Sequence, residues 1–375
     1  MRLGLFMPPA HPPERSTYDA HQWNLDVISM ADELGYIEAW VGEHFTAAWE
    51  PIPSPDLLIA QALMRTKNIR LGPGAHLLPF HHPVELAHRI AYLDHMSQGR
   101  LLLGIGSGSI PTDMQVFNVD PGTNQHREMT REALEIIFHL WQTDGPYEFK
   151  GKFWDVKIPD PNEFEWANFR LHQKPFQKPH PPIGVAAASV GSETLKIAGE
   201  KGYIPMSLGM GGAYLSSHWE AVLEGAKCGN RTPPSRGEWR IVRDIWVADT
   251  DEEAYEGARE GMLFRAWREY FMKLYSFGPY PLTRYVKHDA SVPDDAVDLE
   301  YMMEHIWLVG SPETVARKLR TLYEQCGGFG VLLAMSLDHL DDRAGWEKSM
   351  RLLAEDVMPR VADLTGEKTV AGGVR

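Results

Sequence analysis

The sequence predicts a single (β/α)8 TIM barrel with insertions, which belongs to the α/β fold class. Short apolar runs alternate with longer helical patterns along the chain, about eight such runs can be counted, and neither a linker nor an internal repeat divides the sequence. Repeating strand–helix units with apolar strands are typical of a parallel sheet covered on both faces. Because α/β barrels commonly run from about 200 to more than 400 residues, we expect residues 1–375 to form one domain.

The predicted elements follow one another in barrel order. The expected strands are Leu3–Met7, Tyr36–Val41, Asn68–Leu71, Arg100–Ile105, Pro182–Ala187, Tyr203–Met206, Trp239–Ala248 and Phe329–Met335. Helices are expected to begin at Ser54–Pro55 and at Ser311–Pro312, where a Ser cap precedes Pro, and a long helix is expected from Asp249–Glu253 to about Leu274.

Two insertions are expected, near residues 145–180 and 276–300. The first includes a β-hairpin at Phe149–Val156. The second, Ser276–Leu299, is Pro-rich and carries Phe277, Tyr280 and Tyr285. We interpret this second segment as a lid that keeps water out of a site at the barrel mouth.

Composition and charge restrict the partners. The chain has 37 Lys and Arg against 51 Asp and Glu, a formal net charge of −14 without a basic stripe, which argues against nucleic acid and anionic membranes. No apolar run approaches the ~20 residues that span a bilayer, and the N-terminus has no signal-peptide pattern. Cys228 and Cys326 lie far apart without metal-ligand spacing. We therefore expect a soluble cytoplasmic protein in a reducing compartment.

The residues that directly follow the apolar runs are the candidates for an active site, because TIM-barrel enzymes work at the carboxyl ends of their strands. They include Glu43–His44, Gly74–His76, Gly106–Ser109 and Ser189–Ser192. None supplies a pair of acids suited to glycoside hydrolysis or an HxH motif suited to a metallohydrolase. His81–His82, before Pro83, is interpreted as a surface turn. The sequence therefore predicts no metal site.

Two small-residue segments are typical of sites that hold a flat ligand with a phosphate. Gly104–Gly108 departs from GxGxxG because Ser109 stands at the last position, so we interpret it as a tight strand exit that a flat ligand can approach. Ser189–Val190–Gly191–Ser192 opens a helix, and its N–H groups and hydroxyls suit a phosphate, although a simple Ser N-cap explains the same pattern. Arg127, near the start of the helix after the fourth strand, has the charge and fork geometry that a phosphate favours.

Four motifs stand in the order found in bacterial luciferase-like monooxygenases, and the similarity runs over nearly the whole chain. They are Trp40–His44 (WVGEH), Leu77–Pro83 (LLPFHHP), Gly99–Gly106 (GRLLLGIG) and Gly310–Thr314 (GSPET). Trp49–Ala60 and Gly327–Gly330 resemble the diketocamphane and limonene monooxygenases in particular. Each motif alone is weak, whereas four in order at matching spacing are specific.

The resemblance implies a barrel that binds reduced FMN at its C-terminal face, with FAD or coenzyme F420 less favoured. It implies that the flavin phosphate is held by Arg127 and by the segment Ser189, Val190, Gly191 and Ser192. It implies a non-prolyl cis peptide bond at Gly74–Ala75 that supports the ring, and His44 beside the reactive edge of the flavin. Luciferase has His, Cys and Glu where this chain has Phe45, Gly106 and Ala188. These departures argue against light emission and leave room for a bulkier substrate.

The implied reaction is the oxygenation of an apolar organic substrate by reduced FMN and O2 through a C4a-peroxyflavin. The oxygen transfer is either a Baeyer–Villiger oxidation or a hydroxylation or epoxidation. His44, with an ordinary pKa of about 6.5, is the candidate to hold or accept the proton of the peroxide, although a lone histidine at a strand end is more often structural.

The resemblance also implies a separate flavin reductase as partner and a homodimer formed through the helices after the second and third strands. Two other functions stay open. One is a coenzyme F420-dependent reductase or dehydrogenase on the same barrel, and the other is a non-catalytic flavin-binding protein. A metal-dependent hydrolase is disfavoured because the ligand spacing is missing.

Overall fold

The computed structural model describes residues 1–160, 162–163, 165–167, 171–276 and 284–366. Its centre is a nine-stranded sheet in the order β3-β2-β1-β13-β10-β9-β8-β5-β4. The strands are β1 (Arg2–Met7), β2 (Glu38–Val41), β3 (Arg70–Pro73), β4 (His76–Leu77), β5 (Leu103–Gly106), β8 (Ile183–Ala187), β9 (Ile204–Ser207), β10 (Arg240–Arg243) and β13 (Val331–Met335).

The sheet closes into a barrel because β3 also bonds to the chain just before β5. Leu71 and Leu101 form a parallel bridge. The amide of Leu71 donates to the carbonyl of Arg100 at 3.0 Å, and the amide of Leu102 donates to the carbonyl of Leu71 at 2.8 Å. With β4 left aside as a short extra strand, the remaining eight strands form a closed parallel ring. The predicted (β/α)8 barrel is confirmed.

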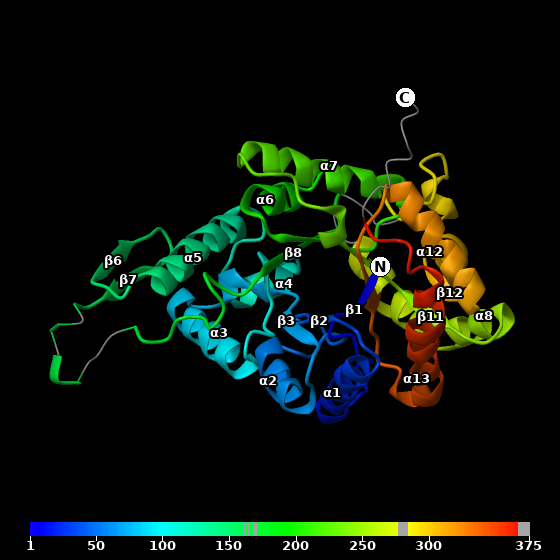
Figure 1. Ribbon diagram of the computed structural model, residues 1–375, viewed down its shortest axis with the longest axis horizontal. Helices are drawn as coiled ribbons and strands as arrows, with labels where there is room; N and C mark the ends of the chain where they lie inside the picture. Colours follow the sequence, from blue (N-terminus) through cyan, green and yellow to red (C-terminus); the bar gives the residue numbers. More distant parts are fainter. Residues whose placement is uncertain (161, 164, 168–170, 277–283, 367–375) are drawn as a thin grey trace.

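Helices surround this ring, with α1, α2 and α3 following one another around the N-terminal half and α12 and α13 beside the C-terminal half (Figure 1). The helices are α1 (Thr17–Glu33), α2 (Pro55–Arg65), α3 (Pro83–Ser97), α4 (Pro111–Val116), α5 (Gln125–Gln142), α6 (Glu193–Lys201), α7 (Gly212–Cys228), α8 (Asp251–Glu260), α9 (Met262–Ala266), α10 (Met272–Ser276), α11 (Leu299–His305), α12 (Pro312–Cys326), α13 (Arg343–Leu352) and α14 (Met358–Arg360). Among the described residues, we find no helix long and apolar enough to cross a membrane.

The barrel interior has a charged layer at one end and an apolar layer above it. Arg240 and Glu38 form a buried bidentate ion pair, with Nε–Oε1 at 3.0 Å and Nη2–Oε2 at 3.1 Å. Such a pair is stable only when its remaining bonds are also made, and Trp40 Nε1 donates to the same carboxylate at 3.0 Å. The apolar part of the interior is filled by Phe6, Trp40, Leu102, Met206, Val242, Val331 and Leu333.

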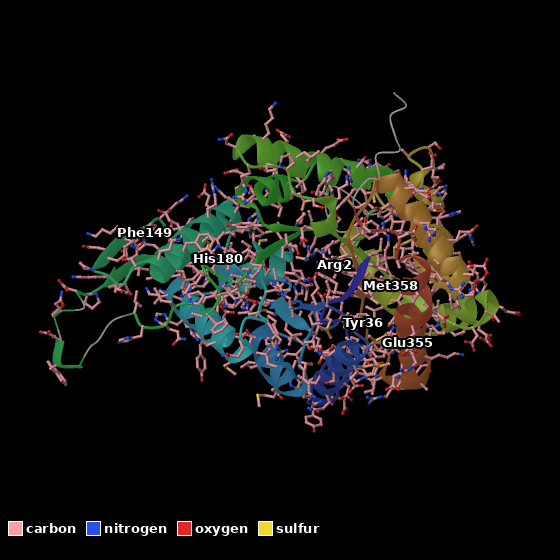
Figure 2. All side chains as sticks on the ribbon, viewed as in Figure 1. Arg2, Tyr36, Phe149, His180, Glu355 and Met358 are labelled. Atoms are coloured by element: carbon pink, nitrogen blue, oxygen red, sulfur yellow. The ribbon has the colours of Figure 1, made fainter. Side chains whose placement is uncertain are left out.

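The C-terminal segment closes the outside of the barrel next to the first two strands. In Figure 2, Tyr36 lies beside the segment that carries Glu355 and Met358. Tyr36 is 2% exposed, and its hydroxyl donates to the carbonyl of Met350 at 3.4 Å. The first and last parts of the chain therefore belong to one packed core.

The predicted strand Trp239–Ala248 is wrong as a single element. It divides into β10 and β11 (Ile245–Val247), and β11 leaves the ring to pair with β12 (Leu308–Gly310), a short strand that the sequence did not predict. The division falls at Asp244, whose carbonyl accepts from the amide of Leu308 at 2.9 Å. A buried carboxylate between two apolar runs marks this break.

The predicted long helix after Asp249 is also divided. Gly261 adopts an extended conformation between α8 and α9, and a π-helical segment, η4 (Trp267–Phe271), separates α9 from α10. Glycine is a poor helix former, which accounts for the break at Gly261. As described below, η4 carries side chains of the candidate site.

The first insertion contains the predicted hairpin, formed by β6 (Tyr147–Lys150) and β7 (Asp155–Ile158). It extends away from the barrel beyond α5, as the position of Phe149 shows (Figure 2). In the second insertion, Phe277 and Tyr280 of the predicted lid lie outside the described residues. Tyr285 is described, and its ring packs edge-on against Tyr214 at 5.6 Å.

Candidate active site at the barrel mouth

His44 lies just after β2 at the carboxyl end of the barrel, between two buried carboxylates. Its Nδ1 donates to Asp113 Oδ2 at 3.2 Å, and its Nε2 lies 3.5 Å from Glu50 Oε2. Asp113 is fixed at the start of α4 because its other oxygen accepts from the amide of Thr46 at 2.8 Å. The second contact is longer than a normal hydrogen bond. Nε2 is therefore the histidine atom that remains available to a ligand.

The two carboxylates decide the protonation of His44. Burial alone lowers the pKa of His44, but the hydrogen bond to Asp113 and the charge of Glu50 outweigh burial and raise the pKa above its ordinary value. Glu50 itself accepts from the hydroxyl of Tyr270, which belongs to η4, at 2.6 Å. This arrangement favours the protonated form of the imidazole, in which Nε2–H is able to donate.

The preceding residue, Glu43, forms a separate buried cluster. Its two oxygens accept from His76 Nδ1 at 2.7 Å and from His81 Nε2 at 2.6 Å. Burial raises the pKa of Glu43, but the bonds from both histidines outweigh burial and lower it. Arg89 donates to His81 Nδ1 at 3.2 Å and is paired with Asp56. The interpretation of His81 as part of a surface turn is wrong, because a buried carboxylate holds its ring.

Within the described ranges, Glu43, His76 and His81 are the one group whose ligand atoms are close enough to hold a metal ion. The three residues already bond to one another through two N–H donors. The guanidinium of Arg89 touches the outer histidine, and a second cation there would meet like charge. This donor set fits a hydrogen-bonded support for the loop better than a metal centre.

The predicted phosphate-binding residues follow two neighbouring strands, since β5 pairs with β8 in the ring. Ser189–Ser192 come directly after β8, whereas Arg127 lies on α5, after β5 and α4. Arg127 lies exposed in the first turn of α5, and the described part of the chain offers its guanidinium no hydrogen bond. Ser192 is the N-cap of α6, and Gly191 has a positive φ of 61° with no atom within 4 Å of an added Cβ. Ser189 and Val190 are exposed. This arrangement leaves a helix N-terminus and an uncommitted arginine open to an anion.

A buried chain of hydrogen bonds fixes the loop that begins at Ser189. Trp239 Nε1 donates to Ser207 Oγ at 2.8 Å, Ser207 Oγ donates to His218 Nδ1 at 2.8 Å, and His218 Nε2 donates to the carbonyl of Ser189 at 2.8 Å. Burial lowers the pKa of His218 to about 4, so the ring stays neutral in this chain. The loop conformation is therefore set from the barrel core.

The small residues next to this loop form a flat surface. As predicted, the Gly74–Ala75 peptide bond is cis. A Cβ added to Gly106 would lie 3.1 Å from Leu77 and 3.4 Å from Ala75. A side chain at Gly106 would therefore crowd its neighbours, whereas a planar ring is able to lie over the bare backbone. These residues and the anion site fit a flavin nucleotide.

Sequence reasoning found His44 but missed the residues that control it. Asp113, Glu50 and Tyr270 come from a short helix, a loop and a π-helical segment, and no spacing rule connects them to position 44. The sequence offered one signal for Asp113. Pro111 indicates the start of a helix, α4, and an acid is common in the first turn of a helix.

The closed barrel, the flat backbone surface and the histidine between two acids define a flavin-dependent enzyme of the TIM-barrel type. A model of the luciferase-like monooxygenases matches residues 1–328. The chain belongs to this family, and the predicted class of enzyme, a flavin-dependent monooxygenase, is confirmed.

Three relatives show how far the similarity extends. The chain is 34% identical to 2,5-diketocamphane 1,2-monooxygenase 1 of Pseudomonas putida, over 96% of this chain and 99% of that protein. It is 28% identical to limonene 1,2-monooxygenase of Rhodococcus erythropolis, over 95% and 86% of the two chains. The solved oxygenating constituent of 3,6-diketocamphane monooxygenase from Pseudomonas putida, a type II Baeyer–Villiger monooxygenase in complex with FMN, superimposes with a TM-score of 0.89 at 34% identity, over 96% and 98%.

Proposed function

We propose that this chain is the oxygenating component of a two-component monooxygenase that uses reduced FMN and O2 to oxidise an apolar organic ketone. The observation that carries the proposal is the similarity, over nearly the full length of both chains, to an FMN-bound Baeyer–Villiger enzyme. The relatives favour oxygen insertion beside a carbonyl, with hydroxylation or epoxidation as the other oxygen transfers open to the same cofactor.

We assign the cofactor contacts to the residues predicted for them. Arg127 and Ser189–Ser192 would hold the FMN phosphate, because an open helix N-terminus and a guanidinium both favour an anion. Gly74, Ala75 and Gly106 would support the flavin ring by offering a surface without bulky side chains. Reduced FMN, when bound, supplies the electrons that activate O2.

We assign proton management to His44. Asp113 orients the ring through Nδ1, so Nε2 is the atom that gives a proton to the reacting oxygen or holds it in place. Because the two carboxylates raise its pKa and favour the protonated ring, the role that fits best is that of a proton donor. This assignment narrows the sequence-based prediction, which left His44 to hold or to accept the proton.

A separate flavin reductase is the proposed source of reduced FMN. The relative solved with FMN is described as the oxygenating constituent of its enzyme, which supports a division of labour between two proteins. We infer a transient encounter rather than a permanent complex, since free reduced flavin diffuses between the two.

We also propose a homodimer formed through α2 and α3. Leu57 and Met64 are 65% and 84% exposed on α2, and Tyr92 and Met96 are 62% and 42% exposed on α3. Leu57 and Met64 are seven residues apart, and Tyr92 and Met96 are four residues apart, so each pair lies on one face of its helix. In light scattering, Met64→Glu is expected to convert the dimer to a monomer. Tyr18→Glu, a matched change of an exposed aromatic on α1, is expected to leave the dimer intact.

Residues 1–375 are proposed to form one domain, because β13 pairs with both β1 and β10 and so ties the two halves together. A cytoplasmic location is proposed as well. Both cysteines are free, which agrees with a reducing compartment. Two separate unfolding transitions in calorimetry would contradict the single domain.

Oxygen uptake with defined reduced cofactors tests the proposed function. The protein is mixed with a panel of cyclic ketones and either reduced FMN from a generic reductase or reduced F420. We expect ketone oxidation with O2 uptake when reduced FMN is supplied, and none when reduced F420 is supplied. Without the reductase, the protein should not oxidise NADH. Anaerobic ketone reduction by F420 would favour the dehydrogenase, and FMN binding without any turnover would favour the non-catalytic protein.

A further inference from the structure

One carboxylate oxygen beside His44 lies between two possible donors. Glu50 Oε2 accepts from the hydroxyl of Tyr270 at 2.6 Å and lies 3.5 Å from His44 Nε2. The first distance is that of a strong bond from a hydroxyl to a carboxylate. The second is too long for a charge-assisted bond from an imidazolium, which is normally about 2.7–2.9 Å. Glu50 is therefore bonded to the tyrosine and only near the histidine.

Without a restraint, this ion pair is expected to close. The side chains of His44 and Glu50 are only 19% and 4% exposed, so water screens their attraction weakly. The ring of His44 is also held in place, because Nδ1 donates to Asp113. The restraint on the carboxylate is Tyr270, the one donor that bonds to it in the described part of the chain.

The hydroxyl of Tyr270 is fixed by the residue that precedes Glu50. The ring of Tyr270 stacks on Trp49, with 5.8 Å between ring centroids and 11° between the planes. The guanidinium of Arg265 lies 5.8 Å from the centroid of the same Trp49 ring and pairs with Glu14 at 2.6 Å. Burial and the charge of Glu50 raise the pKa of Tyr270, so its hydroxyl keeps the proton that it donates.

The charged groups around His44 leave Glu50 as the competitor for Nε2. Asp113 on α4 is bonded to Nδ1, and Glu43, the preceding residue, accepts from two other histidines. Tyr275 on α10 is within reach of the charge of Glu50, but it makes no hydrogen bond among the described residues. Glu50, in the loop after β2, is the acid that faces Nε2.

We propose that Tyr270 is a positioning residue, whose hydroxyl holds Glu50 away from His44 Nε2 and so keeps this donor free for the reacting oxygen. The inference rests on the proposed monooxygenase function and adds a residue on which the histidine depends. Without the hydroxyl, the carboxylate of Glu50 is free to move onto Nε2 and to take the bond that a ligand would receive.

Three variants test the proposal, namely Tyr270→Phe, Glu50→Leu and the double variant. In Tyr270→Phe, product formed per O2 consumed should fall about ten- to a hundredfold, because a charge-assisted bond now competes for Nε2. The affinity for FMN should stay unchanged. The double variant has no carboxylate to close onto His44, so its yield should return to that of Glu50→Leu alone.

The pH profile gives a second readout that loss of packing would not produce. In Glu50→Leu, the yield should be lost at a lower pH than in the wild type, because the charge of Glu50 no longer raises the pKa of His44. NMR of ¹⁵N-histidine-labelled protein with oxidised FMN measures this pKa without turnover. It should rise in Tyr270→Phe and fall in Glu50→Leu.

Tyr36→Phe is the control, because Tyr36 is a buried tyrosine at the other end of β2 whose hydroxyl donates to Met350. It should change neither the yield nor the pKa of His44. An unchanged pKa of His44 in Tyr270→Phe, or a loss of yield that Glu50→Leu does not rescue, would overturn the proposal. A wild type that oxidises no ketone would refute the proposed function, and the NMR titration would still decide whether Tyr270 holds Glu50 back.

Discussion

Two histidine–carboxylate clusters begin at adjacent residues, Glu43 and His44, yet they are built in opposite ways. At Glu43, one buried carboxylate accepts from two histidines, and each of its oxygens has a partner. At His44, one histidine lies between two carboxylates, and only Nδ1 makes a hydrogen bond. The first cluster is satisfied within the protein, whereas the second leaves one donor for a ligand.

The comparison separates a structural role from a chemical one that residue types alone do not reveal. Successive residues of an extended segment point to opposite sides, so Glu43 faces the packed loops and His44 faces the mouth. The partners of each group then determine which of its forms is favoured. Two histidine donors lower the pKa of Glu43, and two carboxylates raise the pKa of His44.

Removing His44 is expected to have the largest effect. In His44→Ala, product formation should fall by a factor of about 10² to 10⁴, the usual loss for a general acid or base. Reduced FMN should still bind and O2 should still be consumed, but as hydrogen peroxide. Stopped-flow and end-point assays compare peroxide release with product yield. Normal coupling of oxygen to product in the folded variant would remove His44 from the chemistry.

The Glu43 cluster is expected to show the reverse pattern. Glu43→Gln places an amide N–H against one of the two histidine donors and removes the charge from two buried hydrogen bonds, and a hydrogen bond to a charged group typically contributes about 1.5–3 kcal/mol. Urea unfolding should show this loss of stability, while the ratio of product to oxygen per bound FMN stays normal. Loss of coupling with unchanged stability would mean that the two clusters share one function.

Arg127→Ala is expected to leave both clusters intact and to affect cofactor binding alone. The loss of charge-assisted bonds to the phosphate should weaken reduced FMN by about 1.5–3 kcal/mol, or roughly ten- to a hundredfold. Anaerobic titration measures this affinity, with Arg351→Ala on α13 as a control for an exposed arginine. Equal affinities in the two variants would place the phosphate elsewhere.

The smallest expected effect is a difference in pH dependence. The folded pKa of His44 is raised, so its contribution to stability is fully present below the unfolded pKa of about 6.5 and is lost as pH rises through the folded value. His44→Gln should therefore destabilise the protein more at pH 6 than at pH 9. The Glu43 contribution, from a lowered pKa, should be constant over that range and lost only in acid. Urea unfolding at both pH values distinguishes the two.

The sequence predicted those parts of the fold that short-range patterns encode. Apolar runs located the strands of the ring, and Ser–Pro pairs located the starts of α2 and α12. The division at Asp244 escaped because a single acid in an apolar run does not reveal that the following segment pairs with a different strand. The partners of His44 escaped for the same kind of reason, since Glu50, Asp113 and Tyr270 meet only after the barrel has closed.

Isotope labelling in a single turnover shows whether this chain transfers an oxygen atom from O2 to a ketone. The protein is loaded with photoreduced FMN and camphor as the probe ketone, mixed with ¹⁸O2, and the product is analysed by mass spectrometry. We expect a product that carries one ¹⁸O atom, formed without a nicotinamide cofactor in the mixture. An unlabelled product, or full conversion of the consumed oxygen to hydrogen peroxide across the ketone panel, would contradict it.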